Sequence, residues 1–261
     1  RVEFVNTTTK KADAAVSIDN PRELAYESGS NYLYVSSYTG KVYKIDMTTR
    51  TIAGESEKVG ANLEGIAVAG NKLYVCNSCN PDYTYNKNVV ELNANTLAKN
   101  QDIEVVDNPV DVINAGSAIF ILSMGIYDDK DKPATVQMLK DGQLSTIGNA
   151  TMMAYDSYKD QLYMINAPFG GDKEYKVYNL KNGQTTTFLT NPDIFSPYSL
   201  AVNPVNGDVF ITSSTKNPDT GYADYTADCK LYRYTSAGIL LGTYDCGVNP
   251  GTIVCDSYYQ K

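Results

Sequence analysis

The sequence contains no histidine and no tryptophan among its 261 residues. Histidine is the commonest general base near neutral pH and the commonest ligand of transition metals. Its absence excludes Ser-His-Asp and Cys-His catalytic arrangements and every zinc site that needs imidazole. We therefore expect no catalytic residues, no metal and no other cofactor, and we expect that the protein is not an enzyme.

Long apolar runs and positive charge are also missing. No stretch approaches 18 consecutive apolar residues, so no membrane-spanning helix is expected. The net charge is −8 and the isoelectric point is about 4.6. A nucleic-acid partner is disfavoured, because the phosphate backbone demands a basic surface. The sequence also lacks a polybasic patch for anionic lipid, and it begins without a secretion signal.

Tyrosine, by contrast, is abundant, with 22 copies. Five short apolar segments share one pattern, at residues 31–37 (NYLYVSS), 71–77 (NKLYVCN), 117–123 (SAIFILS), 160–166 (DQLYMIN) and 207–213 (GDVFITS). Their aromatic positions are separated by 40, 46, 43 and 47 residues, and they are Tyr34, Tyr74, Phe120, Tyr163 and Phe210. Short alternating runs rich in aromatic and β-branched residues indicate buried strands.

Each segment has the same neighbours. An apolar strand precedes it, an alternating strand follows after a variable loop, and a polar turn leads to a fourth strand. Four antiparallel strands in 40 to 47 residues are the period of a β-propeller blade. We predict an all-β fold with five full blades in one domain, residues 1–261. Residues 1–19 match the last two strands of a further blade and residues 251–256 match a first strand, so upstream strands are expected to be missing. The intact protein would have six blades or seven.

The loops between the second and third strands of each blade are expected on one face, beside the links between blades. They vary in length and carry aromatic and polar side chains, whereas the other turns are short. Length variation on a rigid scaffold is typical of binding sites. The expected ligand-binding residues on this face are Tyr38, Tyr83, Tyr85, Tyr127, Asp128, Phe169, Tyr198, Tyr222 and Tyr225. The alternative is that aspartate simply favours turns and that tyrosine is frequent throughout.

The same face should receive the ends of the first strands, where carboxylates could bind a cation. Only Glu23, Glu64 and Asp111 could supply them. A calcium-dependent lactonase of the six-bladed type needs such ligands and no histidine. Solvated strand ends explain the three acids equally well.

Five cysteines remain to be explained. Cys76 and Cys79 are expected at the start of a loop, where a disulfide is favoured over redox chemistry or zinc. Cys229 and Cys246 would face each other if the turn between them has Ala237 and Gly238 at its centre. A three-residue turn with a glycine bulge would shift this register by one. Cys255 is expected as a buried thiol on an inner strand.

The segments EGIAVAGNKLYVCNS, SPYSLAVNPVNGDVFITSS, KLYRYTSAG and NPGTIVCD together resemble the YncE-like propellers of gut Bacteroidetes. Among these they are most similar to the BtuG-type surface lipoproteins, which capture cobalamin at an outer-membrane transporter. The resemblance covers nearly the whole chain. It implies seven blades, an N-terminal lipid anchor at the cell surface, a corrinoid ligand on the loop face and a TonB-dependent outer-membrane transporter as partner. The CNSC motif and the long acidic loop before Cys229 depart from that group.

The sequence thus favours a cell-surface protein that captures a small ligand and passes it to a transporter. The alternative is a propeller whose loop face binds a protein or a glycan. A lactonase-type hydrolase is the third hypothesis.

Overall fold

The computed structural model describes residues 1–255, which form strands β1 to β23 and no helix. The fold is all-β, of the β-propeller type, and is built from successive antiparallel sheets, as predicted. No helix within this part of the chain is long and apolar enough to cross a membrane. The chain divides into two compact units, residues 1–148 and residues from 149 onward. Each is described by itself, and the single domain remains a prediction.

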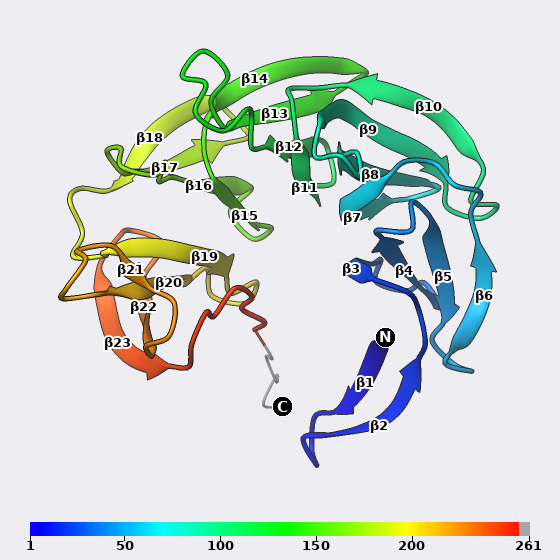
Figure 1. Cartoon of the computed structure of the whole chain (residues 1–261), viewed down its shortest axis with the longest axis horizontal. Coiled ribbons are helices and arrows are strands. Elements are labelled where there is room, and N and C mark those ends of the chain that lie inside the picture. Colours follow the sequence, from blue (N-terminus) through cyan, green and yellow to red (C-terminus); the bar gives the residue numbers. More distant parts are fainter. Residues whose placement is uncertain (256–261) are drawn as a thin grey trace. The chain divides into compact units, whose positions relative to one another are not determined.

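The first unit contains one hairpin and three four-stranded sheets, each antiparallel with its strands adjacent in chain order (Figure 1). The hairpin is formed by β1 (Val2–Asn6) and β2 (Lys11–Val16). The first sheet comprises β3 (Pro21–Tyr26), β4 (Tyr32–Ser37), β5 (Val42–Asp46) and β6 (Thr51–Glu55). The second comprises β7 (Asn62–Ala69), β8 (Lys72–Cys79), β9 (Tyr85–Asn93) and β10 (Lys99–Glu104). The third comprises β11 (Pro109–Asn114), β12 (Ile119–Ser123), β13 (Thr135–Lys140) and β14 (Gln143–Asn149).

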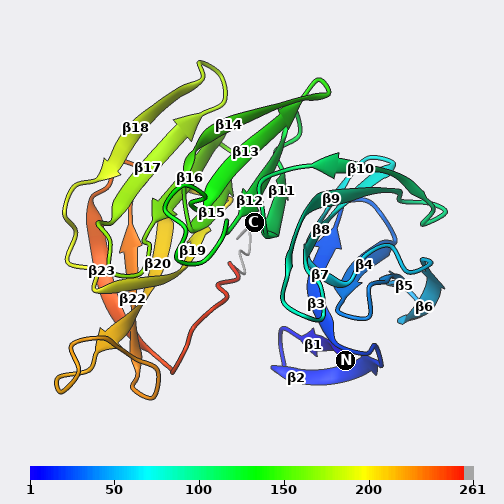
Figure 2. The ribbon, with the colours of Figure 1, turned by 45° about the horizontal axis from the view of Figure 1, so that its top comes forward.

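The second unit contains two sheets, which Figure 2 shows in an oblique view. One comprises β15 (Met152–Asp156), β16 (Gln161–Asn166), β17 (Glu174–Asn179) and β18 (Gln184–Leu189). The other comprises β19 (Ser196–Val202), β20 (Val209–Lys216), β22 (Cys229–Tyr234) and β23 (Leu240–Cys246). A two-residue strand, β21 (Ala223–Asp224), pairs with the end of β20 inside a long loop. The sequence pattern did not predict β21.

Apolar side chains fill the space between neighbouring sheets of each unit. Because the second strand of every sheet is buried on both faces, its residues pack against two neighbours. Tyr34 and Val42 of the first sheet join Leu63 and Val75 of the second in one apolar cluster. In the other unit, Tyr163 and Ile165 pack with Val209 and Ile211. Four of the five repeated aromatic positions, Tyr34, Tyr74, Phe120 and Tyr163, are therefore core positions, and Phe210 is partly buried.

The variable loops lie beside the links between sheets, as blade topology predicted. In the first unit, the amide of Val59 in one link donates to the carbonyl of Gly40, at 2.8 Å, in the loop after β4. The amide of Met124 donates to Asn108 at 2.8 Å in the same way. In the second unit, the Lys173 ammonium in the loop after β16 lies 5.8 Å from the Phe195 ring in the link before β19. The Asn249 side chain, in the segment after β23, donates to the carbonyl of Tyr225 at 3.2 Å. Within each unit, links and variable loops thus share one edge of the sheets, which we call the loop edge.

The disulfide expected between Cys76 and Cys79 is wrong. Both thiols are free and both residues belong to β8, which runs past the expected loop start. Three residues along a strand place two Cα atoms about 10 Å apart, beyond the span of a disulfide. Cys76 is buried in an apolar cluster, whereas the Cys79 sulfur accepts a hydrogen bond from Asn62 at 3.3 Å.

Cys229 and Cys246 lie directly opposite each other on β22 and β23. The turn does contain a glycine bulge, because Gly238 has φ +79° and the Thr235 amide donates to Ile239. This shifts the register by one, and a second bulge between Arg233 and Tyr234 restores it. The two thiols are free in the structure, and their disulfide remains a prediction.

The expected first strand at residues 251–256 is not formed. Residues 251–255 adopt no strand, and Asp256 lies outside the described residues. Cys255 is partly exposed rather than buried. The segment has the apolar pattern of a strand, but no strand of the described chain pairs with residues 251–255. Residues 1–19, in contrast, form the predicted two strands.

Candidate functional site

Bulges recur at the loop-edge end of the first strand in four of the five sheets. The register shifts between Pro21 and Leu24 in β3, and between Leu63 and Ile66 in β7. Further shifts follow Pro109 in β11 and Pro197 in β19. A bulge leaves extra residues unpaired and re-aims their side chains, and bulges are frequent beside functional sites. In the first unit the residues freed in this way include Arg22, Glu23 and Glu64.

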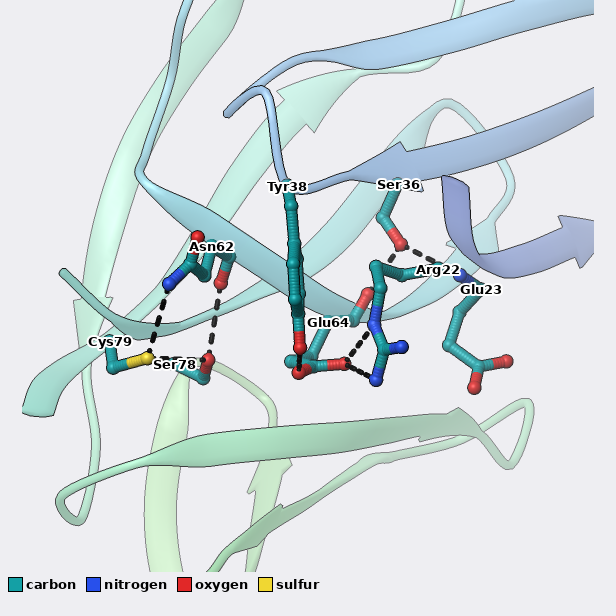
Figure 3. A network of polar contacts seen from close by, with 8 residues as sticks. All are labelled: Arg22, Glu23, Ser36, Tyr38, Asn62, Glu64, Ser78 and Cys79. Carbon is teal, nitrogen blue, oxygen red and sulfur yellow. Dashed lines mark hydrogen bonds and ion pairs between the residues drawn. The ribbon is translucent and has the colours of Figure 1, made fainter. Parts of the chain in front are cut away.

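Arg22, Tyr38 and Glu64 form the centre of a polar network in the first unit. Figure 3 shows the Arg22 and Tyr38 side chains meeting at the Glu64 carboxylate. The Arg22 guanidinium donates to one carboxylate oxygen from Nε at 2.9 Å and from Nη2 at 2.8 Å, and the Tyr38 hydroxyl donates to the other oxygen. The guanidinium also lies 4.5 Å from the centroid of the Tyr38 ring. Burial and the Glu64 hydrogen bond raise the pKa of Tyr38 to about 12, so this phenol remains protonated.

Backbone contacts hold this network in place. The Ser36 hydroxyl on β4 accepts from the Glu23 amide at 3.1 Å and donates to the Glu64 carbonyl (Figure 3). One side chain therefore ties the bulges of β3 and β7 together. A bulged carbonyl and amide would otherwise lack strand partners, which is costly when they are buried.

Asp111 and Glu23 are the carboxylates of this region with raised pKa values. Burial raises the pKa of Asp111 to about 6, the charge of Glu23 adds to this, and the Val112 amide opposes it. Burial also raises the pKa of Glu23, against the effect of Arg22. A carboxyl group with a pKa near 6 exchanges its proton close to neutral pH, which suits acid–base chemistry or pH-dependent binding.

Gly65 allows Asp111 to lie this close to β7. A Cβ atom on Gly65 would be 2.6 Å from the Cα of Asp111 and 2.9 Å from the Val110 carbonyl oxygen. Both are backbone atoms, so neither can rotate away. A residue with a side chain at position 65 would push β11 from β7 and displace Asp111.

The three carboxylates do not form the calcium site considered from the sequence. Both oxygens of Glu64 are occupied by Arg22 and Tyr38. Within residues 1–255, no group of three or more histidine, cysteine, aspartate or glutamate side chains is arranged to hold a metal ion. A calcium-dependent mechanism through Glu23, Glu64 and Asp111 therefore finds no support in their geometry.

Other predicted residues of the first unit lie outside this network. Tyr83 and Tyr127 are in loops of the loop edge, with their side chains largely exposed, and Asp128 is exposed beside Tyr127. Tyr83 has φ 64°, which is uncommon for an aromatic residue. Tyr85 is the first residue of β9 and not a loop residue, and it faces Cys79 across the sheet.

In the second unit, the structure brings two of the predicted residues together. The rings of Phe169 and Tyr222 are stacked, with centroids 5.9 Å apart and an interplanar angle of 18°. Tyr225 lies in the same loop as Tyr222, and Tyr198 occupies the bulge of β19. Both are exposed.

Sequence reasoning missed Arg22 as a site residue, and it missed Lys173, Phe195 and Lys216 in the second unit. The position of Arg22 beside Glu23 at a first-strand end was the available signal. For Lys173 and Lys216, the available signal was a lysine a few residues from an aromatic residue, in the loop after β16 and at the end of β20. Neither signal states which residues meet in space.

Comparison with known proteins identifies the fold alone. No protein-family model and no curated protein sequence matches the chain. Solved structures of propeller-type proteins do match it. One is of a nidogen/laminin complex, with a TM-score of 0.61, 11% identity and coverage of 91% of this chain and 85% of that one. Another is a gluconolactonase from Xanthomonas campestris, with a TM-score of 0.56, 18% identity and coverage of 90% and 77%.

The expectation that the protein is not an enzyme is corrected by the second comparison. The gluconolactonase is an enzyme with the same type of fold. The expectation rested on the absence of histidine and on the view that solvated strand ends explain the acids equally well, but carboxylates with raised pKa values also carry out acid–base chemistry. Neither comparison points to the YncE-like or BtuG-type proteins or to Bacteroidetes.

Proposed function

We propose that the protein is a ligand-binding propeller that captures a small ligand through aromatic side chains on the loop edges of its units. The observation that carries this proposal is the exposure of large aromatic side chains there. Tyr83 is 80%, Tyr127 70%, Phe169 79%, Tyr222 64% and Tyr225 60% exposed. Exposed aromatic area is unfavourable in water and gives broad contact at low entropic cost when a ligand covers it.

A corrinoid is the ligand to test first. A large, flat molecule with a polar rim suits aromatic side chains interspersed with amides and carboxylates. The sequence resemblance to BtuG-type proteins supports the same ligand. It also supports a place at the cell surface with an N-terminal lipid anchor, and transfer of the ligand to a TonB-dependent outer-membrane transporter.

Titration of the protein with cyanocobalamin in a calorimeter tests this proposal. We expect saturable heat, and we expect the triple variant Tyr83→Ala, Tyr127→Ala and Tyr225→Ala to bind about tenfold more weakly, because loss of aromatic contact typically costs 1 kcal/mol or more in an interface. The matched control is the double variant Tyr26→Ala and Tyr158→Ala. These tyrosines are also exposed but lie at the turns opposite the loop edge.

Absence of heat and of any shift in the thermal midpoint would exclude a corrinoid. If the triple variant and the control variant bind with equal affinity, the loop edge is excluded as the binding surface. A protein partner in place of a small ligand would give no heat with cyanocobalamin while still requiring the same tyrosines.

Hydrolysis is the second candidate function, favoured by the pKa of about 6 for Asp111. A carboxylate with this pKa can accept a proton from water near neutral pH, and the Arg22 guanidinium on the same edge carries N–H groups beyond the two nitrogens that bind Glu64. The gluconolactonase of the same fold makes a sugar lactone the substrate to test.

We expect the protein to hydrolyse gluconolactone faster than the spontaneous reaction. This excess rate should increase as the pH rises through about 6, because the base is the deprotonated form of Asp111. Asp111→Asn should abolish this excess. Asp131→Asn, in an exposed loop of the same unit, is the matched control and should leave it unchanged. A rate that persists in Asp111→Asn would exclude Asp111 as the base.

A further inference from the structure

Two loops of the second unit each present an aromatic side chain and a lysine. The loop between β16 and β17, residues 167–173, carries Phe169 and Lys173. The long excursion after β20 carries Tyr222, and Lys216 lies at its base on β20. Strand β21 holds this excursion against β20, with Lys216 opposite Ala223 (Figure 1). The Asn217 amide closes it by donating to the Tyr222 carbonyl at 2.8 Å.

The lysines of both loops meet at one ring. The ammonium nitrogen of Lys173 lies 5.8 Å, and that of Lys216 lies 6.0 Å, from the centroid of Phe195. An aromatic face attracts one cation by its quadrupole. These two distances place the ammonium nitrogens within about 12 Å of each other.

Neither lysine has a carboxylate partner within ion-pair distance among residues 1–255. Both are exposed. Unpaired cations that converge from two loops are unexpected in a chain with a net charge of −8. Charge complementarity therefore favours an anionic group between them, despite the nearby carboxylate of Asp172.

A pocket of about 340 Å³ opens beside Lys173, and its wall includes Asp172, Asn191 and Tyr175. Tyr175 is only 3% exposed and belongs to the apolar core of this unit, so the polar groups that a ligand in the pocket would meet are those of Asp172, Lys173 and Asn191. The stacked Phe169 and Tyr222 rings are exposed in the same two loops and offer flat apolar faces.

We propose that these two loops form a binding site for an acidic saccharide. Lys173 and Lys216 would bind the carboxylate of a uronic acid residue, and the exposed faces of Phe169 and Tyr222 would pack against the apolar face of a sugar ring. The inference uses the same loop edge as the proposed function but goes beyond it, because it holds whether or not a corrinoid binds.

Calorimetric titration of the whole chain with tetragalacturonate tests the proposal, with its full methyl ester as the neutral probe. We expect saturable binding of the acid and about tenfold weaker binding of the ester. The double variant Lys173→Gln and Lys216→Gln should bind the acid more weakly by a similar factor. The control is Lys140→Gln with Lys181→Gln, which removes the same charge from exposed positions outside these loops and should bind like the unmodified protein.

Three results would each overturn the proposal. The first is that the acid does not bind at millimolar concentration. The second is that the acid and the ester bind with equal affinity, and the third is that the variant at residues 173 and 216 binds the acid as tightly as the unmodified protein. A second variant, Phe169→Ala with Tyr222→Ala, should lose affinity for both probes. The same proteins titrated with cyanocobalamin separate the two proposals, since failure of the corrinoid leaves the saccharide result intact.

Discussion

Gly65→Ala is expected to lower the free energy of unfolding by about 2–3 kcal/mol, the usual cost of forcing an extra carbon into a close-packed site. The added Cβ would lie 2.6 Å from the Cα of Asp111. The clash is with backbone, so relief requires β7 and β11 to separate. Urea unfolding measures the effect directly.

Gly148→Ala is the matched control for this substitution. Gly148 is also a strand glycine with φ outside the left-handed region, but a Cβ there would have no atom within 4 Å. We expect a change below about 0.5 kcal/mol, as for most substitutions away from packed sites. If Gly65→Ala and Gly148→Ala unfold at the same urea concentration, the close approach of β11 to β7 is not as described.

Asp111→Asn is expected to make the protein more stable at pH 8 and no more stable at pH 4. The pKa of Asp111 is about 6 in the folded protein, against an ordinary value of 3.8. Between these values the folded state binds more protons than the unfolded state, so stability falls as the pH rises. The loss of stability that comes from ionising Asp111 in the folded protein is complete above about pH 7. A shift of two units corresponds to roughly 3 kcal/mol, and partial exposure of Asp111 reduces the expected gain to about 1–2 kcal/mol.

Thermal unfolding of both proteins between pH 4 and pH 8 provides the measurement. Asp131→Asn, which removes one negative charge from an exposed loop, controls for the change in net charge. Equal stabilisation by Asp111→Asn at pH 4 and pH 8 would contradict a raised pKa. So would a gain of the same size in Asp131→Asn.

The strands and their order could be predicted from the sequence because both depend on local pattern. The second strands are buried on both faces, so Tyr34, Tyr74 and Phe120 had to recur in runs that are apolar throughout. The loop edge followed from connectivity alone, because antiparallel strands in chain order must alternate in direction. The pairing of Cys229 with Cys246 was predicted from a two-residue turn that the structure does not have. The pairing is correct only because the bulge between Arg233 and Tyr234 compensates the glycine bulge in the turn.

The network around Glu64 could not be predicted, since it depends on bulges that leave no pattern of their own. Arg22, Tyr38 and Glu64 come from three strand ends up to 42 residues apart in sequence. The acids were recognised as candidates, but the sequence does not show that Glu64 is neutralised by Arg22 or that Asp111 is desolvated. Likewise, nothing in two separate loops indicates that Lys173 and Lys216 converge on Phe195.

The sequence by itself determined the all-β fold, the position of the core and the edge that carries the loops. These depend on the alternation of side chains along single strands and on chain connectivity, which are local properties. Only the tertiary structure decided which polar and aromatic side chains meet. Among residues 1–255 it gives no disulfide in β8 and no geometric support for a three-carboxylate calcium site. The physical reason is that ion pairs, pKa values and ring contacts depend on distances of a few ångströms between strands, and a one-residue bulge changes such distances without changing the pattern.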